Sequence, residues 1–338
     1  MGKNKIRIIS VYPNFANRGG AQDVALQLAE HLNEEKSIVL TETPSANIVL
    51  EYKTRAQFDL FCKQTVLKLA DGNTLFLSHH RKSTSLLLLY RFFSRNKFPI
   101  IHVAHNTFNN LKYFSFFPDT IVAVSNGVKQ NLMDYFHVHN ERIKVIFNGL
   151  KDNRNNQNKK QEQHEIHILL PGRICEIKQQ IEIIKNTRGK LASHIHFYFA
   201  GLGEDAELLK KEIENDTQYH YVGFLNMYEN LNKYDYVCLF SKKEGLPLSL
   251  IEGCMFGKPL ITNDIPAVLD VNEAGKTGFV YSDLKTLSEG LNLLPMAYSE
   301  DYKRLSYNAR LKYEKYFTED KMLTQYRQII EDEMKLYR

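Results

Sequence analysis

Two glutamates, Glu244 and Glu252, lie eight positions apart in a pattern that surrounds the start of a helix. The apolar, β-branched and aromatic residues 236–240 predict a buried strand, Pro247 suits the first position of a helix, and Gly257 suits its end. Glu244 is therefore expected in a strand-to-helix turn, with Glu252 about five residues into the helix, roughly 7.5 Å along its axis. Because open α/β sheets bind ligands at such turns, the two carboxylates suit different parts of an extended ligand such as a nucleotide sugar.

Positively charged residues follow a second predicted strand, Ile166–Leu170. Arg173 comes directly after Gly172, and Lys178 lies five residues further along the chain. A planar guanidinium can bind two phosphate oxygens at once, a flexible ammonium can neutralise another, and glycine lets the backbone approach closely. This segment therefore predicts a diphosphate-binding loop.

The order of these motifs resembles glycosyltransferase family 4, whose members are retaining enzymes with the GT-B fold. The likeness rests on Glu244-Gly-Leu-Pro247 after a strand, Glu252, Gly257-Lys-Pro259 and Lys276-Thr-Gly278. The resemblance is strong over residues 166–280 and weak in the part of the chain that precedes them. It implies an α/β protein of the GT-B fold, with two Rossmann-like, doubly wound domains facing a central cleft. It also implies retaining sugar transfer without a metal ion or cofactor, in which the donor phosphate takes the acceptor proton.

The resemblance further implies roles for individual residues. The expected catalytic residues are Glu244, His105, Arg173 and Lys178. The residues expected to bind the nucleotide sugar are Gly19, Gly20, Gly172, Arg173, Lys178, Gly201, Gly203, Phe224, Leu225, Glu244, Gly245, Leu246 and Glu252. Glu252 would accept hydrogen bonds from ribose hydroxyls, Glu244 would orient the sugar, and His105 would lie close to it.

The sequence leaves the donor sugar and the acceptor open. A UDP-sugar is the expected donor, and the expected acceptor is a lipid-linked or oligosaccharide one in bacterial capsule, exopolysaccharide or lipopolysaccharide synthesis. Ile265-Pro-Ala-Val-Leu-Asp270 stands where the family usually has glycines and then a glutamate, so the donor sugar is not assigned. Two alternatives are a nucleotide-sugar epimerase of related fold and a non-catalytic partner domain of a transferase. An NAD-binding domain using Glu42 is disfavoured, since Gly-x-Gly-x-x-Gly is absent.

Strand-like runs alternate with helical patterns along the chain, which indicates parallel, doubly wound sheets. The predicted strands are Ile6–Val11, Ser37–Leu40, Thr74–Leu77, Ile100–Ala104, Thr120–Val124, Lys144–Phe147, Ile166–Leu170, His196–Ala200, Tyr219–Val222, Tyr236–Phe240 and Pro259–Thr262. Helices are predicted over Ala21–Leu32 and Phe58–Leu69, among others.

The polar segment 151–165 has no large apolar residue and is predicted to link two domains. The expected domains are an acceptor-binding one over residues 1–150 and a nucleotide-sugar-binding one over residues 166–300. The helices over 301–338 are expected to cross back to the first domain.

The composition supports this organisation. A chain of 338 residues suggests two domains, and an apolar fraction of 43% supplies two cores. A net charge of +5 is too mild for a dedicated nucleic-acid binder, although it permits attraction to an anionic surface. The four cysteines form no C-x-x-C pair, and no signal peptide or apolar run of about 18 residues is found, so a cytoplasmic location is expected.

The basic segment 81–98 predicts contact with an anionic membrane surface, on the inner face of the cell membrane. As a helix, it has a broad apolar face that the domain can bury, made of Leu86, Leu89, Tyr90, Phe92 and Phe93. Leu87 and Leu88 would then be exposed beside Arg91 and Arg95, which suits the interface of an anionic leaflet. The alternative is a core helix with solvated arginines.

Overall fold

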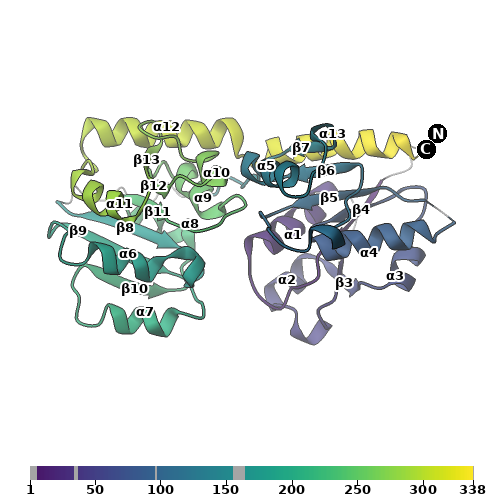
Figure 1. Cartoon of the computed structure of the whole chain (residues 1–338), viewed down its shortest axis with the longest axis horizontal. Helices are drawn as coiled ribbons and strands as arrows, with labels where there is room; N and C mark the ends of the chain where they lie inside the picture. The colour runs from purple at the N-terminus through teal and green to yellow at the C-terminus, as the bar shows by residue number, and fades with distance from the viewer. Residues whose placement is uncertain (1–5, 34–36, 96, 155–163, 338) are drawn as a thin grey trace. The chain divides into compact units, whose positions relative to one another are not determined.

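The computed structural model describes residues 6–33, 37–95, 97–154 and 164–337, and the chain divides into two compact units (Figure 1). The first unit is formed by Met1–Asn148 together with Glu319–Arg338, and the second by Gly149–Thr318. Most of the predicted linker, residues 155–163, lies outside the described residues.

The first unit is built on a seven-stranded parallel sheet with the order β3-β2-β1-β4-β5-β6-β7. Its strands are β1 (Arg7–Val11), β2 (Ile38–Thr41), β3 (Gln57–Leu60), β4 (Thr74–Ser78), β5 (Ile100–Ala104), β6 (Thr120–Ala123) and β7 (Ile143–Val145). The strand order reverses between β1 and β4. In sheets of this kind, ligands usually bind at the carboxyl ends of the two strands between which the order reverses.

Helices cover both faces of this sheet. They are α1 (Gly20–Leu32), α2 (Leu50–Arg55), α3 (Lys63–Leu69), α4 (Arg81–Phe92), α5 (Asn126–Asp134) and α13 (Glu319–Leu336). On one face, strand residues such as Ile9 pack with Val66 of α3 and Leu87 of α4. On the other, Val39 packs with Leu26 of α1 and with α2. Successive strand side chains point to opposite faces, so one sheet supports two cores.

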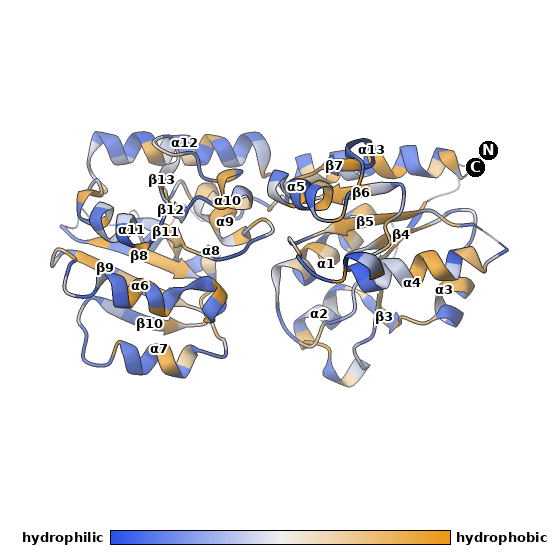
Figure 2. Ribbon diagram, viewed as in Figure 1, coloured by the Kyte–Doolittle hydropathy of each residue, from blue (hydrophilic) through white to orange (hydrophobic). Residues whose placement is uncertain are grey.

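The second unit contains a six-stranded parallel sheet with the order β10-β9-β8-β11-β12-β13, and its order reverses between β8 and β11. The strands are β8 (Ile166–Pro171), β9 (Ile195–Ala200), β10 (Tyr219–Gly223), β11 (Tyr236–Leu239), β12 (Leu260–Asn263) and β13 (Gly278–Tyr281). The helices are α6 (Gln180–Thr187), α7 (Ala206–Glu212), α8 (Met227–Asn230), α9 (Leu248–Met255), α10 (Pro266–Leu269), α11 (Leu284–Gly290) and α12 (Glu300–Tyr316). The strands are mostly hydrophobic, as expected where helices cover both faces (Figure 2).

The two C-terminal helices belong to different units. Helix α12 packs on α9 in the second unit, whereas α13 packs on α1 in the first. Gln27 of α1 donates to Glu319 of α13 over 2.8 Å, and Arg327 donates to the carbonyl of His31 over 3.0 Å. Of the predicted crossing segment 301–338, only α13 joins the first unit.

The predicted fold, with two doubly wound parallel sheets, is confirmed, but some elements differ. The helix predicted over Phe58–Leu69 is wrong in its first part, because Gln57–Leu60 forms strand β3 against β2 and the helix begins at Lys63. Strand β13 was not predicted, and β7 begins and ends earlier than expected. Among the described residues, no helix combines the length and apolar character needed to cross a membrane.

The predicted facing of α4 is also wrong. Its buried residues are Ser83, Thr84 and Leu87, while Leu89 and the aromatic side chains at its end are exposed. Thr84 can face the sheet because its hydroxyl is satisfied there: Thr84 Oγ1 donates to Ser78 Oγ over 2.8 Å and lies 2.7 Å from His102 Nδ1. Ser83 Oγ, in contrast, is buried without a hydrogen-bond partner among the described residues.

Candidate active site

Two of the predicted catalytic residues form an ion pair at the switch point of the second sheet. Lys178, in the 3₁₀ turn Glu176–Lys178 after β8, lies 2.5 Å from a carboxylate oxygen of Glu244, in the turn after β11. Because β8 and β11 are the neighbours between which the strand order reverses, this pair lies at the switch point, where such sheets usually bind ligands. The two side chains are 21% and 10% exposed, so the pair is shielded but still open to a ligand.

The turn that carries Glu244 is held from two sides by residues that sequence reasoning missed. Ser241 Oγ lies 3.0 Å from the carbonyl of Ile177 and 3.1 Å from that of Lys243, and its single proton can be donated to either. On the other side, Asn263 at the end of β12 donates from Nδ2 to the Ser241 carbonyl over 2.7 Å and accepts from its N–H over 3.3 Å. Ser241 and Asn263 are both buried, so these bonds fix the Glu244 turn to its neighbouring loops.

The predicted phosphate loop is held by glycine contacts to the loop beside it. The Ala200 carbonyl accepts from Gly172 N–H over 2.8 Å, and Gly201 N–H donates to the Gly223 carbonyl over 2.7 Å. Gly172 and Gly201 have φ of +148° and +147°, which L side chains rarely adopt. A Cβ on Gly201 would lie 1.9 Å from the Gly172 oxygen, and one on Gly203 would lie 2.1 Å from the Ile174 oxygen. Gly201 and Gly203 are therefore required for loop packing, and their predicted ligand contacts stay a prediction.

Replacement of Gly203 by alanine is expected to destabilise the second unit. The new methyl group would overlap the Ile174 backbone, and overpacking of this kind typically costs about 1–3 kcal/mol of unfolding free energy. The matched control is Gly72→Ala, since a Cβ on Gly72 meets nothing within 4 Å and neither glycine has a positive φ. Urea unfolding followed by circular dichroism measures both variants. Equal stability of the two would contradict the close packing described here.

Arg173 projects from the same loop as an exposed side chain, and the described residues include no side-chain partner for its guanidinium. Its backbone is nevertheless fixed by Gln180, a buried residue that sequence reasoning missed. Gln180 Nε2 donates to the Arg173 carbonyl over 2.9 Å, and Gln180 Oε1 accepts from Cys175 N–H at 3.4 Å. The loop thus presents one cation to solvent and a second, Lys178, to Glu244.

The remaining predicted site residues of the second unit differ in their exposure to solvent. Glu252 is the fifth residue of α9 and half-buried, and that helix begins at Leu248 with Pro247 as its N-cap, one residue later than predicted. Phe224 is 61% exposed directly after β10, where a ring is accessible to a ligand. Leu246 is buried in the core, as is Gly245, so both contribute to placing the Glu244 turn.

In the first unit, Gly19 is the N-cap of α1 and Gly20 its exposed first residue. Gly19 N–H donates to the Tyr52 hydroxyl over 3.3 Å. Burial raises the pKa of Tyr52 and that of Asp23 in the first helical turn. Because Asp23 lies in the first turn of α1, an anion bound at Gly19–Gly20 would lie at the same helix end as the Asp23 carboxyl group.

His105 directly follows β5, and its ring is paired with that of His79. His105 Nε2 lies 2.8 Å from His79 Nδ1, and the two rings meet edge to edge, with centroids 5.1 Å apart and an interplanar angle of 29°. Surrounding protein lowers the pKa of His105 to about 3 and that of His79 well below its usual value, so both imidazoles are neutral at pH 7. Within the described part of the chain, no group of three His, Cys, Asp or Glu side chains is arranged to hold a metal ion.

Two family profiles match this chain: "Glycosyl transferases group 1" over residues 151–312 and "Glycosyltransferase Family 4" over residues 18–154. Together with the two doubly wound parallel sheets, these matches confirm the predicted resemblance to glycosyltransferase family 4 and its GT-B fold.

Solved structures support the same fold. HepE of Anabaena in complex with UDP has a TM-score of 0.84 at 15% identity, covering 97% of this chain and 100% of that one. A glycosyltransferase of Rickettsia africae has a TM-score of 0.82 at 18% identity, covering 98% and 100%. The lipopolysaccharide outer core galactosyltransferase WaaB, in its apo form, has a TM-score of 0.73 at 14% identity, covering 96% and 99%. At these identities the likeness establishes the fold alone.

Curated relatives match at higher identity but over less of their length. The O-antigen biosynthesis glycosyltransferase WbnH of Escherichia coli is 27% identical over 162 residues, which are 48% of this chain and 46% of that protein. The O-antigen biosynthesis glycosyltransferase WclY of Escherichia coli is 24% identical over 273 residues, 72% of this chain and 75% of that protein. The chain thus spans about half the length of WbnH.

Proposed function

We propose that this chain is a retaining, metal-independent glycosyltransferase that moves a sugar from a nucleotide sugar to a lipid-linked or oligosaccharide acceptor in O-antigen or related surface polysaccharide synthesis. The observation that carries the proposal is the Lys178–Glu244 ion pair at the switch point, beside the exposed Arg173. The names of the relatives WbnH and WclY support the pathway. UDP is the expected nucleotide, because HepE has been solved with UDP and with UDP-glucose.

In this proposal the diphosphate binds against Arg173 and displaces part of the Lys178 contact with Glu244. The two cations then stabilise the negative charge that develops on the departing diphosphate, which is electrostatic catalysis by groups already in place. The freed oxygens of Glu244 accept hydrogen bonds from the sugar and orient it. Glu252 binds the ribose hydroxyls, Gly19 and Gly20 bind the diphosphate, and neutral His105 binds a sugar hydroxyl.

Thermal unfolding in the presence of a panel of nucleotide sugars tests the proposed donor. A ligand that binds only the native state stabilises it by about 2.7 kcal/mol at a concentration 100 times its Kd. UDP and at least one UDP-sugar should raise Tm, and Arg173→Ala should remove the increase. A panel in which no nucleoside diphosphate or nucleotide sugar shifts Tm would contradict the proposal.

An apolar and basic surface on the first unit is proposed to contact an anionic membrane. The exposed apolar side chains of this surface are Leu89, Phe92, Phe93, Leu111, Tyr113, Phe114 and Phe116. The loop that carries the last four is fixed to α4, since Phe116 N–H donates to Ser85 Oγ over 3.1 Å and Arg81 donates to the Asn110 carbonyl over 2.9 Å. Exposed aromatic rings with basic neighbours suit the interfacial layer of an anionic leaflet.

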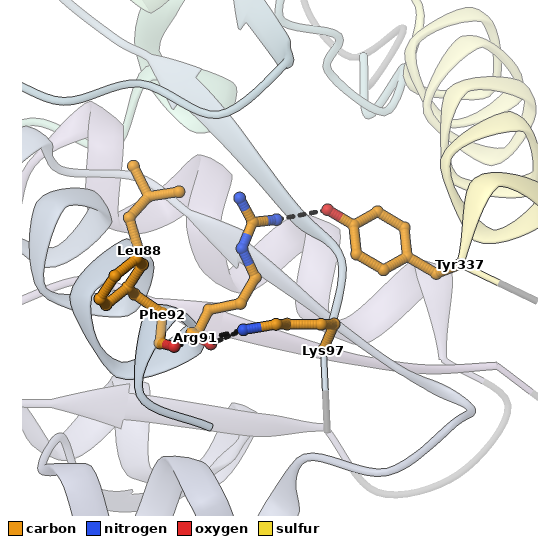
Figure 3. Close-up of a pocket in the computed structure, with 5 residues that line it drawn as sticks. All are labelled: Leu88, Arg91, Phe92, Lys97 and Tyr337. Carbon is orange, nitrogen blue, oxygen red and sulfur yellow. Dashed lines mark hydrogen bonds between the residues drawn. The ribbon is translucent and has the colours of Figure 1, made fainter. Parts of the chain in front are cut away.

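The cations at the end of α4 are not equivalent. A pocket of about 450 Å³ is lined by Leu88, Arg91, Phe92, Lys97 and Tyr337, which are drawn in Figure 3. Arg91 donates to the Tyr337 hydroxyl there, and Lys97 Nζ donates to the carbonyls of Arg91 and Phe92 over 2.9 and 3.2 Å (Figure 3). Arg91 therefore also anchors the end of α13, so a change of Arg95 tests membrane attraction more cleanly.

Membrane binding is expected for anionic but not neutral liposomes, and salt should weaken it. Each basic residue near such a surface contributes about 1 kcal/mol, which ionic strength screens. Arg95→Glu and Phe92→Ser should each reduce sedimentation with anionic liposomes without changing UDP affinity. Leu293→Ser is the control, since Leu293 is 80% exposed on the second unit. Equal binding to neutral and anionic liposomes, or binding to neither, would reject the proposal.

A further inference from the structure

A series of hydrogen-bonded side chains in the first unit ends at His105. Ser10 lies on β1, His79 directly follows β4 and His105 directly follows β5, and these three strands are neighbours in the sheet. Ser10 Oγ donates to the Ala25 carbonyl over 3.0 Å and lies 3.4 Å from His79 Nε2. His79 Nδ1 lies 2.8 Å from His105 Nε2. Ser10 and His79 are buried, so solvent does not satisfy these atoms.

The number of protons on each side chain determines which atom donates and which accepts in each hydrogen bond of the series. A serine hydroxyl has one proton, and a carbonyl can only accept, so the shorter Ser10–Ala25 contact uses that proton. Ser10 Oγ then faces His79 with its lone pairs, and His79 Nε2 must carry the proton to bond it. A neutral imidazole has one N–H, so His79 Nδ1 is bare and accepts from His105 Nε2–H. The same rule leaves Nδ1 of His105 without a proton.

The reverse direction fits the distances less well. It would send the Ser10 proton across the longer contact of 3.4 Å, leave Ser10 without its 3.0 Å bond to Ala25, and make His105 Nδ1 a donor. Both histidines are neutral, because burial lowers the pKa of each. Each ring therefore carries one N–H, and only the two directions of donation described above have to be compared.

We propose that His79 is a positioning residue that holds His105 in the Nε2–H tautomer, so that His105 Nδ1 accepts a hydrogen bond from a hydroxyl of the transferred sugar. Only the identity of the bound hydroxyl rests on the proposed function. The 2.8 Å contact between the two ring edges, at an interplanar angle of 29°, also restrains the orientation of the His105 imidazole, so the acceptor has a fixed direction. A site built to accept from a hydroxyl discriminates against a donor sugar that lacks the proton at that position.

The direct test is nitrogen NMR of protein labelled with ¹⁵N-histidine, with the His105 signals assigned from His105→Asn. The expected result in the wild-type protein is a bare Nδ1 and a protonated Nε2 on both His105 and His79. A protonated Nδ1 on His105 would overturn the proposal. This readout needs neither a substrate nor a folded variant of His79, and it is independent of activity.

Variants test the positioning role. His79→Phe keeps the ring but removes the acceptor, and should lower kcat/KM for the sugar donor about three- to tenfold, the range of one neutral hydrogen bond, with UDP affinity unchanged. His79→Asn supplies an amide oxygen and should recover most of the loss. The control is His102→Asn, a buried histidine bonded to Thr84 outside the series, which should leave the His105 tautomer unchanged.

Analogues of the nucleotide sugar show whether His105 Nδ1 accepts or donates a hydrogen bond. Fluorine accepts but cannot donate a hydrogen bond, so replacing the contacted hydroxyl by fluorine should reduce kcat/KM as much as replacing it by hydrogen. His79→Phe should remove part of this discrimination. A fluoro analogue that retains the activity of the hydroxyl compound at every position, or a His79→Phe enzyme with unchanged kcat/KM, would overturn the proposal. If no donor binds at all, the proposed function fails while the NMR result still decides the tautomer.

Discussion

Arg173→Ala and Lys178→Ala are each expected to lower kcat by about 10²–10³-fold, or ~2.7–4 kcal/mol of transition-state stabilisation, while the protein stays folded. Arg173 is exposed, so its loss removes no packing. Lys178 contacts Glu244 at 2.5 Å, so its loss also leaves a carboxylate unpaired beside the expected diphosphate. Both changes act on charge that increases as the nucleoside diphosphate departs, so kcat should fall more than donor affinity. Steady-state kinetics of the variants and the wild-type enzyme, with the same nucleotide-sugar donor, measure the effect.

The matched control for these charges is Lys242→Ala. Lys242 lies in the turn before Glu244 and pairs with Glu176 at 2.5 Å, but its side chain is 50% exposed and its partner 84% exposed. A pair at the surface contributes little, and this change should leave kcat within about threefold of the wild type. Near-normal turnover in both Arg173→Ala and Lys178→Ala, or an equal loss in Lys242→Ala, would remove the assignment of the diphosphate site.

The two glutamates are expected to separate binding from transfer. Glu252→Ala should weaken UDP binding about 10- to 100-fold, since hydrogen bonds to a charged group contribute about 1.5–3 kcal/mol. Glu244→Gln should leave UDP bound at least as tightly, because Lys178 loses its anionic partner and becomes free to bind phosphate. The same variant should lower kcat strongly, since the amide cannot orient the sugar as the carboxylate does. Calorimetry with UDP and steady-state kinetics measure the two effects.

Metal independence is tested in the same assays. Addition of EDTA should change kcat little in the wild type and in both glutamate variants, because side-chain cations are proposed to neutralise the diphosphate. Loss of activity with EDTA, restored by manganese, would show that a metal ion supplies that charge. Loss of UDP affinity in Glu244→Gln with normal affinity in Glu252→Ala would reverse the two assignments.

The Glu244 turn was predictable because its local signals agree. An apolar strand, a proline near a helix start and a glycine with φ of +64° at its end are all short-range features. The ion pair with Lys178 was not predictable, since the two residues are 66 positions apart and meet only because β8 and β11 are adjacent. Both partners were chosen from the sequence for separate roles, and their contact follows from strand order.

Other features were missed because tertiary contacts outweigh local pattern. Ser241, Asn263 and Gln180 have ordinary polar side chains, and only burial with paired hydrogen bonds reveals their role in fixing the site loops. The facing of α4 was misjudged because Thr84 can be buried when its hydroxyl is bonded. Strand β3 was predicted as part of a helix, because its residues fit the helical pattern that follows. Its four residues form a strand instead, because they pair with β2.

A transfer assay with a nucleotide sugar labelled with ¹³C at its anomeric carbon tests the central claim most directly. The donor panel includes UDP-sugars, the acceptors are lipid-linked and free oligosaccharides, and the reaction contains EDTA. The account predicts that the label moves to an acceptor, that UDP is released, and that NMR finds the donor's anomeric configuration in the product. Label that stays on a nucleotide as an epimerised sugar, or a product with inverted configuration, would contradict the account.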